Sequence, residues 1–292
     1  MVNTVISNLA AKVSFEAVEG LTSTAMPNVS LYKVSQCLEL PPEIYRPIVS
    51  LVLQGEKQLS IGLDVLTYRA GHTFTTALDI PVLGKITQAS VEVPYLAIRL
   101  DINPEAISDL SAQMPDFSGK MDGKVFGINP AGSDLLDAWG RMLRLIDRPE
   151  DVHIMAPLLE REILYRLLSG PQGAILRQLA TAETKIPQIK KAIIFIRENY
   201  SSPLIVEDIA RLIGMSYSAF HRHFKAATGT GPLQYQKNLR LCEARRLLMT
   251  EPTTASSVAF LVGYQSSSQF SRDYKRMFGI PPMREPRINR LS

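Results

Sequence analysis

Alternating hydrophobic and polar positions predict short strands between residues 45 and 102. The stretch "PIVSLVLQGEKQLSIG" has two apolar runs separated by Gly55, and in "YLAIRLDI" every second residue from Leu96 is apolar, with Arg99 between. Residues two apart lie on one face of a strand, so this period indicates packed strands. Further breaks follow at turn-like spacing, at Gly62, Gly71 and Gly84. Many short strands at such spacing predict a compact β-barrel or a β-sandwich.

After Gly132 the apolar spacing becomes helical. The stretches "SDLLDAWGRMLRLID" and "MAPLLEREILYRLL" predict two amphipathic helices joined by a turn at Pro149. Their stripe consists of Leu135, Trp139, Met142, Leu143, Ile146, Leu159, Ile163 and Leu167. Such a stripe either covers the sheet or forms a dimer seam, and the pattern alone favours neither. Residues 170–188 are then expected to join two domains.

The rest of the chain contains an internal repeat. Residues 204–232 match residues 254–282 at a displacement of 50, although Ala259 and Gly263 fall one position short of it. Each copy predicts an apolar helix, a glycine turn, a serine N-cap and a second helix with two aromatic residues four apart. This is the pattern of a helix-turn-helix, present twice, at about residues 204–228 and 254–278.

The second helix of each copy has one apolar and one polar face. In a helix that begins at Ser216, Phe220 and Phe224 share a face and anchor it on the preceding helix. Arg222 is placed to form bidentate hydrogen bonds with a guanine edge. The residues predicted to contact bases are Ser218, His221 and Arg222 in the first copy and Ser267, Ser268, Gln269, Ser271 and Arg272 in the second. Those predicted to contact the DNA backbone are Ser216, Lys225, Ser266 and Lys275.

These polar residues also have a simpler interpretation. A lone surface arginine is more often a solvated cation, but Arg222 and Arg272 recur at the same place in both copies, which favours contact with DNA. His221 fits an exposed histidine nearly as well, and His223 is expected on the packing side.

Residues 232–248 predict a long helix between the two units. Its apolar residues Leu239, Leu241, Ala244 and Leu248 are expected to face inward and hold the units at a fixed separation. Two such helices in successive major grooves are ~34 Å apart, one turn of DNA. Because the two copies differ in sequence, the DNA site is expected to be asymmetric.

Charge divides the chain in the same place. From Lys185 onward there are 17 Lys and Arg against 7 Asp and Glu, whereas residues 1–184 have 15 against 21. The net charge of +4 therefore conceals an acidic part joined to a basic part. A basic helical domain is typical of proteins that bind phosphate backbones.

The C-terminal third resembles the AraC/XylS class of bacterial transcription regulators, through "VGYQSSSQFSRDYKRMFGIPP" (262–282). "IYRPIVSLVLQGEKQLSIG" and the strands after it resemble the cupin-like sensor domain of one branch of that class. The resemblance implies an α+β chain with a cupin-like β-barrel (1–130), a helical hairpin and linker (131–184) and an all-α tandem helix-turn-helix domain (185–292).

The resemblance also implies function and partners. The expected protein is a regulator, more commonly an activator, that binds double-stranded promoter DNA and RNA polymerase. Its sensor half is expected to bind a small-molecule effector or respond to a stress signal, or to form a homodimer. The base-reading positions of the family fall on the residues given above. One departure from the family pattern follows Pro282, where Glu285 and Pro286 replace an aromatic residue and an arginine.

Other functional classes find little support in the sequence. A metal oxygenase needs two or three histidines and a carboxylate, but two of the four histidines lie in the predicted DNA-binding helix, which leaves His72 and His153. No glycine-rich phosphate loop or nucleophile elbow is present. We therefore expect no enzyme, no metal and no cofactor. Tyr68, His72 and Arg99 are polar residues of the predicted strands whose direction the pattern leaves open.

Two cysteines are too few for a disulfide framework. Cys242 is expected to be a small core residue. Cys37 is expected to be buried, because "VSQCLEL" supplies no cation to activate the thiol, although a sensor thiol is the alternative. The first residues lack a signal-peptide pattern and no apolar run reaches ~20 residues, so we expect a cytoplasmic protein.

Overall fold

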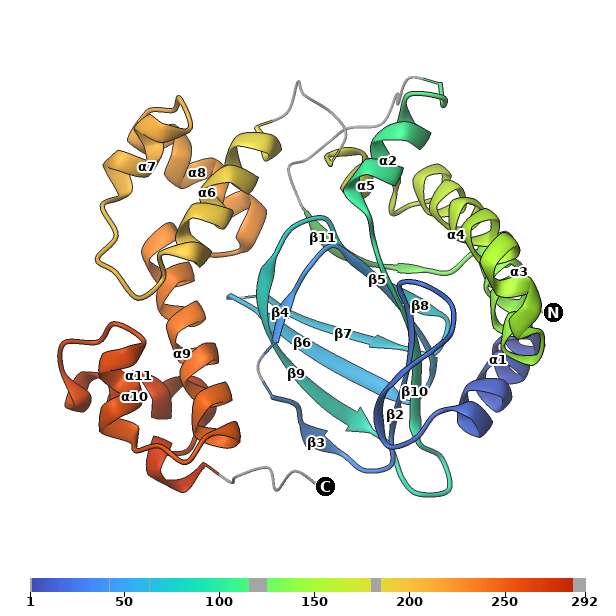
Figure 1. Cartoon of the computed structure of the whole chain (residues 1–292), viewed down its shortest axis with the longest axis horizontal. Helices are drawn as coiled ribbons and strands as arrows, with labels where there is room; N and C mark the ends of the chain where they lie inside the picture. The colour runs from blue at the N-terminus through green and yellow to red at the C-terminus, as the bar shows by residue number, and fades with distance from the viewer. Residues whose placement is uncertain (1, 42, 63, 116–124, 180–184, 286–292) are drawn as a thin grey trace.

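The computed structural model describes residues 2–41, 43–62, 64–115, 125–179 and 185–285. An N-terminal β-sheet domain and a C-terminal helical domain lie side by side (Figure 1). The predicted α+β class is therefore confirmed. None of the helices in these residues is long and apolar enough to cross a membrane.

The strands form two antiparallel sheets. The six-stranded sheet runs in the order β1 (Gly20–Ser23), β2 (Val29–Val34), β10 (Tyr95–Asp101), β5 (Ile48–Gln54), β8 (His72–Thr76), β11 (Phe126–Pro130). The other sheet runs β3 (Leu38–Glu39), β9 (Ile80–Gln88), β6 (Glu56–Ile61), β7 (Asp64–Arg69), and β4 (Glu43–Tyr45) also pairs with β9. Strands therefore begin at Gly20, well before the predicted region.

The expected barrel is not closed. Among the described strands no ladder joins the two sheets. The chain crosses from one sheet to the other at sharp turns. Gly55, between β5 and β6, has φ +78°, and a Cβ there would lie 2.5 Å from the carbonyl oxygen of Gln88. Gly71, between β7 and β8, has φ +83°. Glycine adopts this backbone conformation without the steric cost of a side chain.

The central strands of the six-stranded sheet are packed on both faces. In β10, Leu96 and Ile98 join the cluster under the helices, whereas Tyr95 and Ala97 face the other sheet. The alternation seen in the sequence therefore separates two buried environments. Arg99, on the same face as Tyr95, borders a cavity between the sheets.

A helical layer covers the outer face of the six-stranded sheet (Figure 1). It consists of α1 (Val2–Glu16), α3 (Ser133–Arg144) and α4 (Val152–Ser169), with the short turns η1 (Leu145–Asp147) and η2 (Pro149–Asp151) between the last two. The stripe residues Leu135, Trp139, Met142, Leu143, Leu159, Ile163 and Leu167 are all buried, and Ile146 is half-buried against the same cluster. The stripe therefore packs in the core. We did not predict α1, although its buried residues Ile6, Leu9, Ala10 and Val13 have helical spacing.

Two short helices complete this part of the chain. They are α2 (Pro104–Ser111) and α5 (Gly173–Arg177). The second lies within the expected junction 170–188, of which residues 180–184 are outside the described residues. The proposed boundaries at 130 and 184 stay a prediction.

The C-terminal helices repeat as the sequence does. They are α6 (Ile186–Glu198), α7 (Val206–Leu212), α8 (Tyr217–Thr228), α9 (Pro232–Thr250), α10 (Ala255–Leu261) and α11 (Ser267–Phe278), followed by the turn η3 (Pro282–Arg284). Helices α8 and α11 are displaced by 50 residues at both ends, but α7 and α10 by 49. The turn before α11 is therefore one residue longer, which explains why Ala259 and Gly263 fall one position short.

The two parts of the chain meet along β9 and the turn after β6. Tyr235 of α9 donates a hydrogen bond to the Asp79 carbonyl (2.8 Å), and Arg197 of α6 forms an ion pair with the Asp79 carboxylate. A Cβ at Gly62 would lie 2.6 Å from Cγ2 of Thr230, just after α8. The second helix of the first repeat thus ends against the β-sheet domain.

Candidate functional sites: two exposed helices and a buried cavity

Helix α8 is fixed at both ends and along one face. The Ser216 hydroxyl accepts a hydrogen bond from the Ala219 amide (3.3 Å), and Gly229 ends the helix with φ +74°. Phe220 and Phe224 are fully buried, edge to face with centroids 5.4 Å apart. An N-cap hydrogen bond of this kind stabilises a helix by ~1 kcal/mol. The predicted cap and both predicted anchors are confirmed.

The polar residues of α8 face solvent. The residues predicted to contact DNA, Ser216, Ser218, His221, Arg222 and Lys225, are all exposed, and His223 is half-buried. Arg222 has no hydrogen-bond or ion-pair partner among the described residues. The His221 ring instead stacks on Tyr217, with centroids 6.2 Å apart. Arg222 is therefore available to an external partner, and His221 is partly engaged within the protein.

Helix α11 repeats this arrangement. The Ser266 hydroxyl accepts from the Gln269 amide (3.3 Å), Gly279 ends the helix with φ +76°, and the anchors Phe270 and Tyr274 are buried. Of the predicted contact residues, Ser266, Ser268, Gln269, Arg272 and Lys275 are exposed, and Ser267 and Ser271 are half-buried. Arg272 also has no partner among the described residues. The two arginines thus occupy equivalent, unpaired positions.

Arg240 of α9 joins the loop before the first helix-turn-helix unit to the turn of the second. Its guanidinium donates to the carbonyls of Tyr200 (2.6 Å), Ser202 (2.9 Å) and Gly263 (2.9 Å). Gly263 has φ +90°, and a Cβ there would lie 1.9 Å from the Ser201 carbonyl oxygen. We did not predict this set of three hydrogen bonds from Arg240, called the Arg240 clamp below. Its signal in the sequence is an arginine between two inward leucines of the same helix.

The same long helix carries the apolar link between the units. The inward residues predicted for it, Leu239, Leu241, Ala244 and Leu248, are all buried, as is Cys242. Helix α9 spans 19 residues, a length of about 28 Å at 1.5 Å per residue. The two units are thus held at a fixed separation by packing and by Arg240.

Glu285, which belongs to the departure from the family pattern, is held by two side chains. The Tyr274 hydroxyl donates to its carboxylate (2.6 Å), and Arg245 of α9 forms an ion pair with it (Nε to Oε1, 2.7 Å). The Glu285 side chain is nearly fully buried. Burial and this carboxylate both raise the pKa of Tyr274. Glu285 therefore links the segment after α11 to α11 through Tyr274 and to α9 through Arg245. The next residue, Pro286, is outside the described residues.

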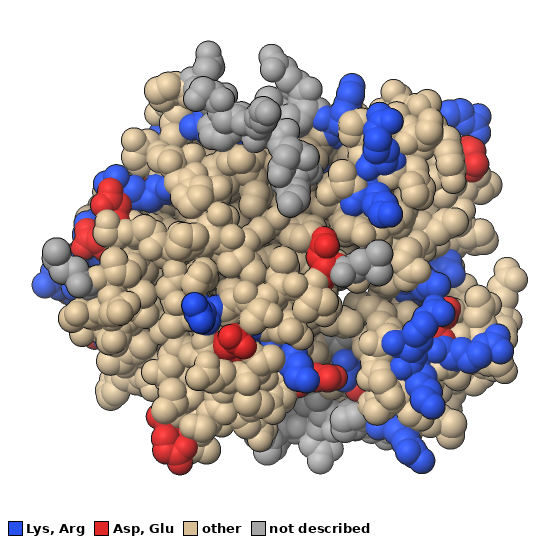
Figure 2. Space-filling model, turned by 180° about the vertical axis from the view of Figure 1, so that it is seen from behind, with Lys and Arg blue, Asp and Glu red and all other residues tan. Residues whose placement is uncertain are grey.

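Basic side chains gather on the helical part. Figure 2 shows Lys and Arg concentrated on the side that holds the C-terminal helices, and acidic side chains are sparse there. This agrees with the excess of 17 basic over 7 acidic residues from Lys185 onward. Such a field attracts a polyanion before any specific contact forms.

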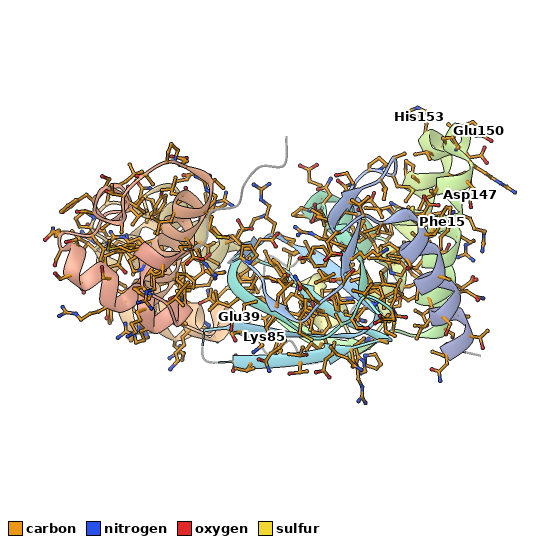
Figure 3. All side chains as sticks on the ribbon, turned by 90° about the horizontal axis from the view of Figure 1, so that it is seen from below. Phe15, Glu39, Lys85, Asp147, Glu150 and His153 are labelled. Carbon is orange, nitrogen blue, oxygen red and sulfur yellow. The ribbon has the colours of Figure 1, made fainter. Side chains whose placement is uncertain are left out.

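The remaining histidines do not form a metal site. His153 lies with Asp147 and Glu150 at the end of the molecule opposite the C-terminal helices (Figure 3). Nδ1 of His72, on β8, lies 3.2 Å from the Arg69 carbonyl oxygen, to which it donates in the tautomer protonated at Nδ1. No group of three or more His, Cys, Asp or Glu able to hold a metal ion occurs among the described residues.

The cysteines differ from each other. Cys242 is buried, as predicted, and burial raises the pKa of its thiol to about 12. Cys37 is exposed, so the expectation of burial was wrong. It lies in the loop between β2 and β3, where its Sγ is 3.3 Å from the Thr87 carbonyl oxygen. The sequence around Cys37 does not predict that this loop leaves the thiol exposed.

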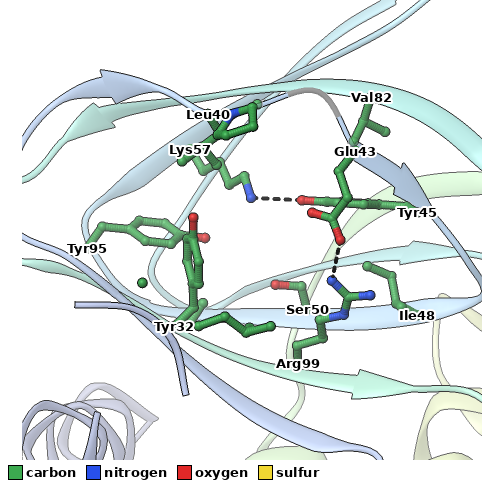
Figure 4. A pocket seen from close by; sticks show the side chains of 15 residues that line it. Tyr32, Leu40, Glu43, Tyr45, Ile48, Ser50, Lys57, Val82, Tyr95 and Arg99 are labelled. Atoms are coloured by element: carbon green, nitrogen blue, oxygen red, sulfur yellow. Dashed lines mark hydrogen bonds and ion pairs between the residues drawn. The ribbon is translucent and has the colours of Figure 1, made fainter. Parts of the chain in front are cut away.

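A cavity of about 380 Å³ lies between the two sheets. Its walls are mainly apolar, and its lining includes Leu21, Tyr32, Leu40, Pro41, Ile48, Val82, Tyr95 and Ala97. Its polar groups are Glu43, Tyr45, Ser50, Lys57 and Arg99 (Figure 4). The volume falls at the lower end of the ~300–1,000 Å³ typical of ligand pockets. A small, mainly apolar molecule with a polar head fits this lining.

Lys57 of β6 is the buried cation of this cavity. The residue is 6% exposed, and its ammonium donates one hydrogen bond, to the Tyr45 hydroxyl (2.8 Å). The rings of Tyr32 and Tyr45 lie 5.5 and 5.6 Å from it. No carboxylate among the described residues lies within ion-pair distance of Lys57. Burying an unpaired ion costs several kcal/mol, against up to about 2 kcal/mol for a desolvated cation–π contact.

Arg99 and Glu43 form an ion pair at the edge of the same cavity. Nη1 of Arg99 lies 2.8 Å from Oε1 of Glu43, and Nε lies 2.9 Å from Oδ1 of Asp101. These carboxylates raise the pKa of Arg99 against the opposing effect of its partial burial. Arg99 is thus neutralised by two carboxylates, whereas Lys57 has none among the residues that the structure describes.

Part of this cavity could be predicted from the sequence. Arg99, one of the three polar residues of the predicted strands, lines the cavity. Tyr68 is instead buried in the core between the sheets, and His72 is half-buried. We missed Lys57. Its signal is its place two residues before Leu59 and four before Ile61 of β6, which are both fully buried.

A second cleft, of about 440 Å³, separates the five-stranded sheet from α8 and α9. It is lined by Ser60, Gly62, Pro81, Leu83, His221, Lys225, Gly229, Thr230, Gly231, Gln234, Asn238 and Met277. The strand β9 borders both spaces. Val82 and Gly84 line the cavity, and Pro81 and Leu83 line the cleft. One strand therefore separates the cavity from residues of α8 that are predicted to contact DNA.

Comparisons with known proteins agree with these two parts. Residues 25–175 match the family model of the AraC-type transcriptional regulator N-terminus, and residues 209–285 match a helix-turn-helix domain. The HTH-type transcriptional regulator ArgR of Pseudomonas aeruginosa is 26% identical over 149 residues, which are 51% of this chain and 45% of that protein. The Msm operon regulatory protein of Streptococcus mutans is 22% identical over 240 residues, 80% of this chain and 82% of that protein. These relatives are transcriptional regulators, not enzymes.

A solved structure has the same fold along most of the chain. ToxT of Vibrio cholerae, crystallised with a bound unsaturated fatty acid, superposes with a TM-score of 0.53 at 12% identity, over 87% of this chain and 92% of that one. The first family model alone covers more than half of the residues. The chain belongs to the family of AraC-type transcriptional regulators.

Proposed function

We propose that this regulator reads an asymmetric promoter site through α8 and α11, and that a small molecule in the cavity between the sheets controls it. The observation that carries the first part is the pair Arg222 and Arg272, which are exposed at equivalent positions of two capped helices and have no partner within the described part of the chain. An arginine held in this way on a rigid helix is suited to bidentate hydrogen bonds with a guanine.

The proposed contacts divide into two kinds. Ser218, His221, Arg222, Ser267, Ser268, Gln269, Ser271 and Arg272 contact bases, and Ser216, Lys225, Ser266 and Lys275 contact the backbone. Phosphate contacts supply affinity that falls with salt, and base contacts supply sequence choice. Because Ser267 and Ser271 are half-buried and His221 stacks on Tyr217, we expect smaller contributions from these three.

The spacing of the two boxes follows from α9. A rigid link between the units supports binding to successive major grooves on one face of DNA, ~34 Å apart. The Arg240 clamp supports one fixed spacing rather than a range of spacings.

Control by the cavity is supported by the position of β9. A molecule that changes the position of Val82 or Gly84 also displaces Pro81 and Leu83, because the four are consecutive residues of β9. Those residues border the same cleft as His221. ToxT, with its bound fatty acid, is one protein of this fold that holds a small molecule. We infer that ligand binding between the sheets alters how α8 is held.

The regulator is proposed to activate transcription by contacting RNA polymerase, which is the commoner mode in its family. A homodimer is supported by the outer face of α4, where Ile154, Leu158 and Tyr165 are 65%, 58% and 43% exposed. These residues are separate from the buried stripe of the same helix. Core packing and dimerisation thus use opposite faces of α4.

The test is selection of genomic DNA fragments by the purified full chain, alongside Arg222→Ala and Arg272→Ala. We expect a motif of two unlike boxes about one turn apart, each weakened by one variant only. A symmetric motif, or one that both variants weaken equally, would contradict the proposed assignment of helices to boxes.

A further inference from the structure

Among the polar groups of the cavity, Lys57 is the one whose charge is not balanced. An ammonium has three N–H donors, and a single acceptor, the Tyr45 hydroxyl, is within hydrogen-bond distance among the described residues. Figure 4 shows the ammonium directed into the cavity from β6, beside the rings of Tyr32 and Tyr45. Two donors therefore point toward a space bounded mainly by hydrocarbon.

The nearby carboxylate does not serve this lysine. Glu43 pairs with Arg99 at 2.8 Å, and half of its side chain is exposed. Asp101, the second partner of Arg99, is more than half exposed. Both carboxylates thus lie at the rim, whereas Lys57 lies within.

The walls restrict the rest of the ligand. Leu40, Ile48, Val82 and Ala97 are apolar and offer no hydrogen-bond donor or acceptor from their side chains. The polar groups of the lining are in part already paired, since Glu43 binds Arg99 and Tyr45 accepts from Lys57. A ligand with several hydroxyl groups, such as a sugar, would have to compete with these pairs, and each hydroxyl buried without a partner costs binding energy. A single anionic head on an apolar body satisfies both Lys57 and the walls.

We propose that the effector is an apolar monocarboxylate whose carboxylate accepts hydrogen bonds from Lys57. Glu43 acts as an internal competitor, since its carboxylate lies at the rim of the same cavity and repels a second one. This inference rests on the proposed control of the regulator by the cavity, and it adds the chemical class of the ligand and the residue that selects it.

The experiment compares three probes that share one body and differ in the head. They are 4-butylbenzoate, 4-butylbenzyl alcohol and 4-butylbenzylamine, titrated calorimetrically into the full chain. Hydrogen bonds to a charged partner predict that the carboxylate binds about ten- to a hundredfold more tightly than the alcohol. The amine is expected to bind most weakly, because two ammonium groups repel each other.

Two variants and one control assign this preference to its residues. Lys57→Met keeps the length of the side chain and is expected to abolish the preference for carboxylate while the alcohol binds as before. Glu43→Gln, at a half-exposed position that tolerates the change, is expected to strengthen carboxylate binding. Lys85→Met is the matched control. Lys85 is also on the five-stranded sheet, next to Glu39, but it is exposed and does not line the cavity (Figure 3).

The outcomes separate this inference from the proposed function. Equal affinity for carboxylate and alcohol, or a preference that survives in Lys57→Met, overturns the ligand class. If Lys57→Met does not fold, unchanged or weaker carboxylate binding in Glu43→Gln overturns it as well. Recovery of the two-box DNA motif in any of these cases leaves the proposed function standing, whereas carboxylate binding without any DNA motif would contradict the proposed function alone.

Discussion

Arg240→Ala tests whether one side chain holds the two helix-turn-helix units in register. The wild-type guanidinium donates to three carbonyls, at 2.6, 2.9 and 2.9 Å, in the loop before α7 and the turn after α10. A hydrogen bond to a charged group contributes about 1.5–3 kcal/mol when buried. Arg240 is only partly buried, and water can reach the freed carbonyls, so we discount the three bonds to a total of about 2 kcal/mol.

This loss has two measurable results. The midpoint of thermal unfolding of the helical part should fall by roughly 10 °C, since each kcal/mol shifts a domain of this size by about 4–8 °C. The DNA selection should also change. When the two units are rigidly linked, binding of one unit to its box places the other unit at a high effective concentration near the second box. A looser link lowers this effective concentration.

The assay is therefore a library in which the two boxes are separated by variable lengths of DNA. We expect the wild type to prefer one spacing sharply and Arg240→Ala to bind several spacings with similar, weaker affinity. Arg246→Ala is the control on the same helix, because Arg246 forms an exposed pair with Glu243, worth about 0.3–0.5 kcal/mol. An Arg240→Ala protein with wild-type thermal stability and an unchanged spacing profile would refute the clamp.

Three further predictions concern single side chains. Arg222→Ala and Arg272→Ala should each cost ~1–3 kcal/mol of specific DNA binding without changing the fold, measured by anisotropy; equal losses on random DNA would mean that the arginine holds phosphate. Burial raises the pKa of Cys242 to about 12, so at pH 8 iodoacetamide should label native protein at Cys37 only, and mass spectrometry showing both labelled would contradict this burial. That raised pKa also implies stability that is complete below the unfolded thiol pKa of about 8.5 and is lost as the pH rises toward 12. Asp79→Asn removes the ion pair with Arg197 and should speed amide exchange in α6 several-fold, and unchanged exchange would show that the pair does not hold the two parts together.

The helical part was predictable because its determinants are local. Caps, glycine turns and aromatic pairs four apart all act within a few residues, and a repeat at a displacement of 50 supports each copy with the other. The turn before α11 is one residue longer than its counterpart, and even this appears in the sequence as a shift of Ala259 and Gly263. Arg240 was missed because its three acceptors come from two distant turns.

The β-sheet part was less predictable because its contacts depend on strand pairing. Alternation identified β10 but could not show that both its faces are buried, or that Arg99 borders a cavity. Lys57 comes from β6, Glu43 from β4 and Arg99 from β10, and nothing in the spacing of these residues predicts that they meet. The error at Cys37 has the same cause, since its exposure depends on a loop between two sheets.

The position of β9 connects the chemistry of the cavity with the reading of DNA. Alternate residues of a strand point to opposite faces. Val82 therefore faces the cavity and Leu83 faces the cleft, on opposite sides of the same backbone. A ligand shifts an equilibrium only by its difference in affinity for two states. A carboxylate on Lys57 therefore controls the regulator if β9 differs between those states. The contacts of Gly62 with Thr230 and of Asp79 with Tyr235 are the places where such a difference would reach α8 and α9.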